Sequence, residues 1–300
     1  MAASAGGATY LERLGARSQA TGTVMCLGLD PDPDGLPPGF ARSLAGVERF
    51  AALLLEAAAP LAAAVKPNLA FFEAYGSGGL AALERLRATL PADLPIIADT
   101  KRGDIGSTAA RQAVALFDVL GADAVTVSPY LGSEAVGPLV DRPDRFAYVL
   151  CRTSNPGAGE LQDLEVGAEP AAGGPVERMH ERVARLAAGW GPGGTVGLVV
   201  GATAPEELAR IRAIARGLAF LVPGVGAQGG AVDPVLQHGP ATAAPAGDHV
   251  GGSLLVNVSR GIAGAAVADG PGDPFERVRA AAAEWAGRLP VLPLPPRRPT

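Results

Sequence analysis

The chain has 300 residues, 48% of them apolar, which is enough to bury the core of one barrel-sized domain or of two smaller domains. Its formal net charge is −5 and its only basic cluster is Arg297-Arg298, which argues against nucleic acid or an acidic membrane surface as the main partner. No apolar run is long enough to span a bilayer, and no secretory signal opens the chain, so we expect a cytoplasmic protein. Cys26 and Cys151 lie inside apolar runs and are expected to be buried thiols of a reducing compartment.

Short apolar runs alternate with segments of helical spacing along the whole chain. The first half predicts strands over 23–29, 61–65, 94–98 and 124–127, with helices over 45–58, 79–90 and 107–120. The second half predicts strands over 146–150, 195–200, 219–222 and 253–258. Helices are expected over 176–188, after residue 203 and over 274–286, and a polar Gly/Ala/Pro-rich loop over 157–175.

Eight strands, most of them followed by a helix, predict a single TIM (β/α)8 barrel in the α/β class. We expect the barrel to cover residues 1–288 as the catalytic domain, and the proline-rich segment 289–300 to be a disordered tail. The alternative, a doubly wound open sheet, would favour G-x-G-x-x-G after the first strand, where this chain has DPDPDG.

Ionisable residues follow two neighbouring predicted strands. Asp99 and Lys101 are two residues apart at the end of the third strand, so their side chains are expected to point the same way. Asp104 falls in the turn after Gly103 and need not face the same site. Lys66 and Lys101 are the only lysines among 25 basic residues. Because lysine can exchange a proton and arginine cannot, this bias suggests proton chemistry, with ordinary ion pairs as the alternative.

The ends of the last two strands suggest a phosphate site. A glycine-rich loop (224–230, which contains Gln228) follows the seventh strand, and Arg260 follows the eighth. These are the positions where TIM barrels often bind phosphate, although a flexible loop and a surface ion pair are the plainer interpretations. The three histidines lie away from the strand ends, and no Cys/His ligand set is visible, so we expect neither a metal site nor a nucleophilic triad.

Six segments in register resemble the orotidine 5′-phosphate decarboxylase family, and most closely its longer-chain branch. The segment DTKRGD, residues 99–104, matches the family signature D-x-K-x-x-D. The other segments, in chain order, are GLDPDPD, VKPNLAFFEAYG, TSNPG, PGVGAQGG and VNVSRGI. The resemblance implies a barrel of the ribulose-phosphate-binding type. It also implies a carboxy-lyase without metal or cofactor that converts orotidine 5′-monophosphate to uridine 5′-monophosphate (UMP), the last step of de novo pyrimidine nucleotide synthesis.

The resemblance also implies a role for each matching residue. Lys66, Asp99, Lys101 and Asp104 would form a row of alternating charges, in which Asp99 faces the substrate carboxylate and Lys101 protonates C6. A homodimer with shared sites is implied, because Asp104, Ile105 and Thr108 would reach the neighbouring subunit's site. The remaining residues would bind substrate: Asp30 the ribose, to which Lys66 would also hydrogen-bond, Ser154 the pyrimidine, and Gln228 and Arg260 the phosphate.

Two other functions stay open at this point. A magnesium-dependent sugar-phosphate decarboxylase or aldolase of the same superfamily would carry an acidic metal ligand at the end of the second strand, where this chain has Lys66. A non-catalytic phosphate-binding barrel would keep the phosphate loops without needing both lysines.

Overall fold

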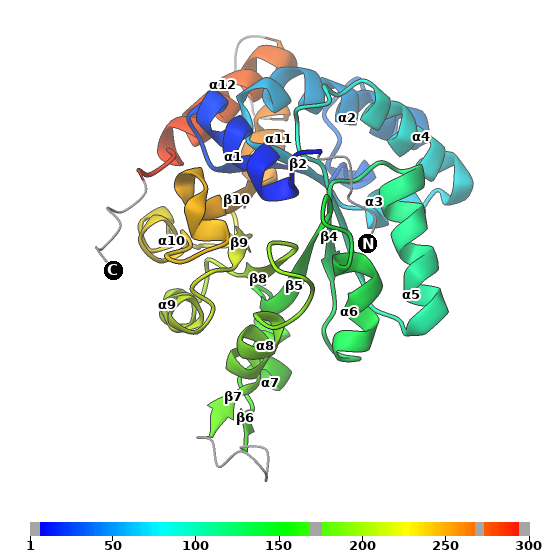
Figure 1. The fold of residues 1–300 in the computed structure, drawn as a ribbon. Coiled ribbons are helices and arrows are strands. Elements are labelled where there is room, and N and C mark those ends of the chain that lie inside the picture. Colours follow the sequence, from blue (N-terminus) through cyan, green and yellow to red (C-terminus); the bar gives the residue numbers. More distant parts are fainter. Residues whose placement is uncertain (1–6, 168–175, 268–272, 294–300) are drawn as a thin grey trace.

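The computed structural model describes residues 7–167, 176–267 and 273–293, and its centre is an eight-stranded parallel sheet closed into a barrel (Figure 1). Hydrogen bonds join the strands in the order β2-β1-β10-β9-β8-β5-β4-β3, and bridges from Val65 to Ile96 and from Asn68 to Asp99 close the ring between β2 and β3. The strands are β1 (Met25–Leu29), β2 (Ala64–Pro67), β3 (Ile97–Arg102), β4 (Ala124–Val127), β5 (Phe146–Arg152), β8 (Val196–Val200), β9 (Ala219–Val222) and β10 (Leu255–Val258). The predicted TIM barrel is confirmed, and each of its eight strands overlaps or adjoins a predicted one.

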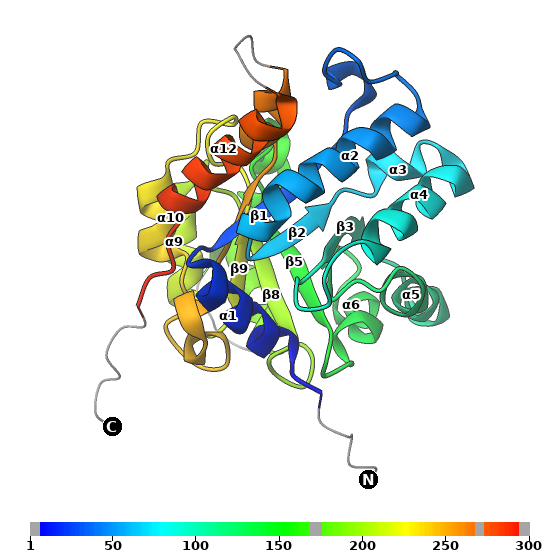
Figure 2. The same cartoon turned by 90° about the horizontal axis from the view of Figure 1, so that it is seen from above.

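Helices surround the barrel, as the alternation of strands and helices predicts (Figure 2). The helix that precedes β1, α1 (Tyr10–Thr21), and the last helix, α12 (Pro274–Arg288), come from opposite ends of the chain. Helix α12 packs beside α2 (Leu44–Ala58), next to β1, so the first and last parts of the chain meet where β1 pairs with β10. The others are α3 (Ala70–Glu73), α4 (Gly76–Ala88), α5 (Gly106–Ala113), α6 (Ser133–Val140), α7 (Gly159–Gln162), α8 (Met179–Ala187), α9 (Pro205–Ile214), α10 (Val232–His238) and α11 (Arg260–Ala263).

Strand alternation divides the apolar side chains between two cores. Residues such as Val65 and Val125 point outward and pack against the helices, whereas Cys26, Ile97 and Tyr148 fill the barrel interior. Helix α1 contributes Tyr10, Leu11 and Leu14 to the interior cluster, at the amino-terminal end of the barrel. The hydroxyl groups of Tyr10 and Tyr148 lie 3.1 Å apart there. Apolar and aromatic side chains therefore fill the interior at its amino-terminal end, and the charged pair Lys66–Asp99 lies at the carboxyl ends of the strands.

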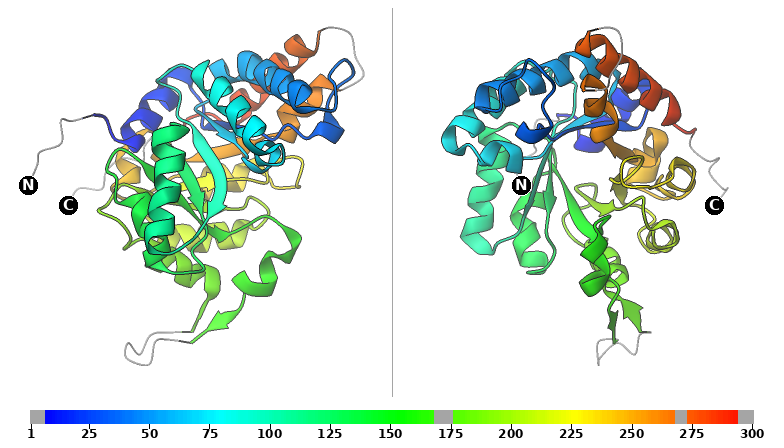
Figure 3. Two further views of the ribbon diagram at one scale, coloured as in Figure 1. Left: turned by 90° about the vertical axis from the view of Figure 1, so that its right-hand side faces the viewer. Right: turned by 180° about the vertical axis from the view of Figure 1, so that it is seen from behind.

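The segment expected to be a loop over 157–175 contains regular structure. It includes α7 and β6 (Glu165–Val166), which pairs antiparallel with β7 (Glu177–Arg178) across residues 168–175, which lie outside the described residues. Figures 1 and 3 show this hairpin, in green, extending away from the barrel. The helix expected over 176–188 begins only at Met179, because the residues just before it are used in the hairpin.

The expected boundary at residue 288 stays a prediction, but the described residues beyond it contact the barrel. Leu289 is buried, and its carbonyl oxygen accepts hydrogen bonds from the Thr23 hydroxyl and from the Val24 amide. The Val291 amide donates to the Gly22 carbonyl. These bonds hold the chain after α12 against the entrance to β1; residues 294–300 of the predicted tail lie outside the described residues.

Candidate active site

Two adjoining cavities open at the carboxyl ends of the barrel strands, and both are lined by Lys66, Asp99 and Pro223. The first, of about 180 Å³, is mostly polar and is surrounded by the ends of β1, β9 and β10. The second, of about 400 Å³, is mostly apolar, with Leu150, Val199 and Leu221 in its wall. Seven of the ten predicted site residues line the two cavities: Asp30, Lys66, Asp99, Lys101, Ser154, Gln228 and Arg260.

Asp99 lies between the two lysines at the junction of the cavities. Its Oδ2 atom is 2.5 Å from Nζ of Lys66, and its Oδ1 atom is 2.6 Å from Nζ of Lys101. The Lys66 and Asp99 side chains are buried, whereas that of Lys101 is 51% exposed. The expectation that Asp99 and Lys101 face the same way is confirmed, and Lys101 remains open to the cavity.

The two lysines determine the protonation state of this cluster. Burial by itself raises the pKa of Asp99, but the positive charges of Lys66 and Lys101 and their hydrogen bonds hold it well below its usual range. Burial lowers the pKa of Lys66, yet the negative charges of Asp99 and Asp30 outweigh this and raise it above its ordinary value. Asp99 is therefore a fixed negative charge at neutral pH, flanked by an ammonium group on each side.

The polar cavity has the features of an anion site. Gly224 in the loop after β9 has φ +101°, a conformation that side-chain-bearing residues rarely adopt, and a Cβ atom there would lie 2.9 Å from Oε1 of Gln228. Gln228 accepts a 2.9 Å hydrogen bond from the Ser154 hydroxyl, which links the polar cavity to the apolar one. Arg260 lies exposed at the rim, where its guanidinium group is available to phosphate oxygens.

Three predicted site residues line neither cavity. Asp104 accepts a 2.8 Å hydrogen bond from the Ile105 amide, and the Ile105 and Thr108 side chains face outward at the start of α5. Their predicted role in a neighbouring subunit's site stays a prediction.

Seven further polar residues that line the cavities are absent from the predicted site residues, and two of them, Thr126 and Asn257, lie on barrel strands. Thr126 on β4 lines the apolar cavity and donates to Asp99, and Asn257 on β10 lines the polar cavity. Strand alternation could have indicated both, because each is a polar residue two positions beyond an interior apolar residue, Ala124 or Leu255. The Oδ1 atoms of Asn257 and Asp30 are buried and have no hydrogen-bond partner among the described residues. Because both residues line the polar cavity, a ligand bound there could donate hydrogen bonds to these two atoms.

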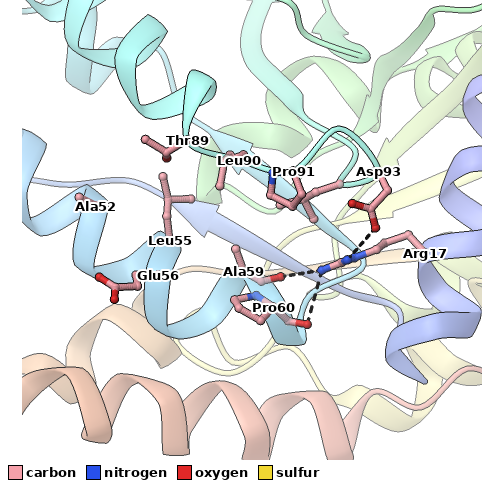
Figure 4. Close-up of a pocket in the computed structure, with 11 residues that line it drawn as sticks. Arg17, Ala52, Leu55, Glu56, Ala59, Pro60, Thr89, Leu90, Pro91 and Asp93 are labelled. Atoms are coloured by element: carbon pink, nitrogen blue, oxygen red, sulfur yellow. Dashed lines mark hydrogen bonds and ion pairs between the residues drawn. The ribbon is translucent and has the colours of Figure 1, made fainter.

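A cavity of about 650 Å³ lies elsewhere, among the loops that lead into β2 and β3 and thus at the opposite ends of the strands (Figure 4). Its arginine, Arg17, donates to the carbonyl oxygens of Ala59, Pro60 and Ala62 and pairs with Asp93 at 3.0 Å. The guanidinium group is thus engaged in joining α1 to these loops. A role in stability is expected at this end of a barrel.

Within the described residues, no group of three or more His, Cys, Asp and Glu side chains is placed to hold a metal ion. His180 is fully buried, with Nδ1 2.8 Å from the Gln162 carbonyl oxygen. No helix in the described ranges combines the length and apolarity needed to cross a bilayer.

Comparisons with known proteins agree with the geometry. Residues 23–269 match the model of the orotidine 5′-phosphate decarboxylase / HUMPS family. The orotidine 5′-phosphate decarboxylase of Roseiflexus castenholzii is 45% identical over 251 residues, which are 84% of this chain and 87% of that protein. The solved structure of Leishmania donovani OMP decarboxylase is 39% identical with a TM-score of 0.76, and the match covers 93% of this chain and 96% of the other.

The structure of Leishmania donovani UMP synthase matches 94% of this chain at 40% identity and a TM-score of 0.78, but this chain spans only 56% of that longer protein. The family model covers most of the chain, and it includes the strand ends that surround both cavities. The chain belongs to the orotidine 5′-phosphate decarboxylase / HUMPS family.

Proposed function

We propose that this protein is a carboxy-lyase that converts orotidine 5′-monophosphate to UMP and carbon dioxide, the last step of de novo pyrimidine nucleotide synthesis. The observation that carries the proposal is the Lys66–Asp99–Lys101 cluster, which lies where a polar and an apolar cavity meet. A nucleotide fits these two cavities, because it has a charged phosphate at one end and a flat, less polar base at the other. The relatives named orotidine 5′-phosphate decarboxylase support the same reaction.

The geometry suggests how each part of the substrate is held. Arg260 and the Gln228 loop bind the phosphate, Asp30 and Lys66 bind the ribose, and Ser154 contacts the pyrimidine. This arrangement brings the substrate carboxylate against Asp99. Because Asp99 stays ionised, it disfavours the bound carboxylate more than the transition state, in which negative charge moves from the carboxylate to C6.

Lys101 completes the reaction by donating a proton. The bond between C6 and the carboxylate breaks, carbon dioxide leaves, and the electron pair left on C6 takes a proton from Nζ of Lys101. The half-exposed Lys101 ammonium group at the edge of the apolar cavity supports this role. The chemistry needs no cofactor, since the charge that develops is stabilised by side chains already in place.

A homodimer with shared active sites is part of the proposal. Asp104, Ile105 and Thr108 would contact the neighbouring subunit's substrate. The exposed apolar side chains of Ile105, Tyr130 and Leu131, which follow β3 and β4 and are exposed by 54%, 85% and 50%, support an interface beside the site. We also propose that the barrel is the catalytic domain and that the protein is cytoplasmic, which is supported by the free, buried thiols of Cys26 and Cys151.

A magnesium-dependent sugar-phosphate enzyme of the same family is the rival function, and the position of Lys66 argues against it. The ammonium group of Lys66 lies at the centre of the site, 2.5 Å from Asp99, where it would repel a divalent cation.

The decisive experiment follows the absorbance of orotidine 5′-monophosphate with purified protein in excess EDTA. We expect conversion to UMP at the same rate with and without EDTA. Turnover that appears only when magnesium is restored would support the rival. If neither condition gives turnover and UMP still binds tightly, the protein is a non-catalytic phosphate-binding module.

A further inference from the structure

We propose that Thr126 is a positioning residue whose hydroxyl fixes both the backbone of Lys101 and the carboxylate of Asp99. The inference rests on the proposed function, because it assigns Thr126 the task of holding the proton donor in place. Thr126 lies on β4, is 2% exposed and lines the apolar cavity beside Lys101.

The Thr126 hydroxyl makes three hydrogen bonds, all of them to β3. It accepts from the backbone amides of Thr100 and Lys101, each at 3.0 Å, and donates to Oδ1 of Asp99 at 2.9 Å. A hydroxyl has one proton to donate and two lone pairs, so its full capacity is used. No hydrocarbon side chain of the same size can make any of these bonds.

The bonds occur where the backbone ladder between β3 and β4 is interrupted. Ala98 pairs with Val125, but the next β3 residue in register is Arg102, which pairs with Val127. The strand β3 therefore bulges over residues 99–101, and a bulge leaves backbone amides without ladder partners. The Thr126 side chain supplies an acceptor for two of these amides, and the Thr100 hydroxyl donates in return to the Thr126 carbonyl at 3.1 Å.

Lys101 has a backbone conformation that needs this support. Its φ is +49°, and Lys101 and Ser253 are the only non-glycine residues with positive φ in the described part of the chain. For a residue with a side chain this conformation is strained, so it persists only where neighbouring groups enforce it. The Thr126 hydroxyl is such a group, because it accepts a hydrogen bond from the backbone amide of the strained residue itself.

The bulge has a chemical consequence. It brings Nζ of Lys101 within 2.6 Å of Oδ1 of Asp99, the oxygen that also accepts from Thr126. One hydroxyl thus sets the position of the proton donor relative to the fixed negative charge. The phosphate-binding residues Gln228 and Arg260 belong to other loops, so loss of the Thr126 hydroxyl is expected to affect the chemical step more than ligand binding.

The test compares Thr126→Val, which keeps the shape and removes the hydroxyl, with Thr126→Ser, which keeps the hydroxyl and removes a methyl group. For Thr126→Val we expect kcat to fall by about tenfold or more, since small displacements of catalytic groups have effects of this order. The dissociation constant of UMP should stay within about threefold of the wild-type value, because the substitution is remote from the phosphate-binding residues. Thr126→Ser should keep kcat within about threefold of wild type.

Two further variants complete the test. Thr100→Val removes only the bond to the Thr126 carbonyl and should leave kcat close to wild type. Thr126→Cys, whose thiol is a weaker hydrogen-bonding group, replaces Thr126→Val if that variant does not fold, and its kcat must also fall. UMP-binding stoichiometry reports the folded fraction of each preparation.

The proposal is wrong if Thr126→Val retains the wild-type kcat, or if Thr126→Ser loses as much as Thr126→Val, which would indicate packing of the methyl group. The Lys101→Ala variant shows whether a negative result concerns only the role of Thr126 or also the proposed proton donor. Full turnover by Lys101→Ala would overturn the assigned proton donor, whereas an inactive Lys101→Ala beside a fully active Thr126→Val would overturn only the role of Thr126.

Discussion

Nζ of Lys66 lies 2.5 Å from Oδ2 of Asp99, and both side chains are buried at the centre of the barrel mouth. The two residues come from neighbouring strands, β2 and β3, at the point where the barrel closes. The second oxygen of Asp99 faces Lys101, so one carboxylate holds two ammonium groups. Since both oxygens are occupied, the position of Asp99 in the cavity is fixed before substrate arrives.

The pH dependence of stability should report the Lys66–Asp99 pair. Because the folded-state pKa of Asp99 lies below its unfolded value of about 3.9, the carboxylate stabilises the fold above about pH 5 and this contribution is lost as the pH falls. Asp99→Asn should be less stable than wild type by about 3 kcal/mol at pH 7, because it leaves Lys66 without its buried anion. Urea unfolding should show this difference shrinking by about 1 kcal/mol between pH 5 and pH 3. A difference that stays constant would mean that Asp99 is not preferentially ionised in the folded state.

Lys101→Ala should abolish turnover, because it removes the proposed proton donor to C6. UMP should still bind, since the phosphate and ribose contacts remain. Rate assays together with calorimetric titration of UMP separate the two effects. Substantial residual turnover would show that another group delivers the proton.

Arg260→Ala should weaken UMP binding by about 1.5–3 kcal/mol, the scale of a hydrogen bond to a charged group. Uridine, which lacks the phosphate, should lose no affinity. Arg210→Ala is a matched control, because Arg210 is also exposed but lines neither cavity. Equal losses for UMP and uridine would place the phosphate elsewhere.

Mixing Asp99→Asn and Asp104→Asn subunits tests the proposed shared site. Each variant alone should be inactive. If Asp104 serves the neighbouring subunit, every mixed dimer contains one intact site, and random mixing should restore about a quarter of wild-type activity. An affinity tag on one of the two variants gives the subunits different masses, so native mass spectrometry can verify the heterodimer. Its failure to react would place Asp104 in the site of its own subunit.

Much of the fold follows from local patterns in the sequence. The eight barrel strands read as short apolar runs because both of their faces are buried, and the residues just after those runs, such as Lys66 and Arg260, lie at the barrel mouth. The β6–β7 hairpin was not predicted, because its strands are only two residues long and its segment is rich in glycine, alanine and proline. So short a pattern cannot be distinguished from a loop.

The barrel, its family and the residues that carry its charges can all be predicted from the amino-acid sequence. The arrangement of those charges depends on contacts between residues that are far apart along the chain. The third strand was predicted to end at Ala98, yet β3 continues through Arg102 with a bulge and a positive φ at Lys101. The reason is that the acceptor stabilising this bulge, the Thr126 hydroxyl, is 25 residues away along the chain from Lys101. A local pattern does not record such a bond, because it exists only once β3 and β4 have paired.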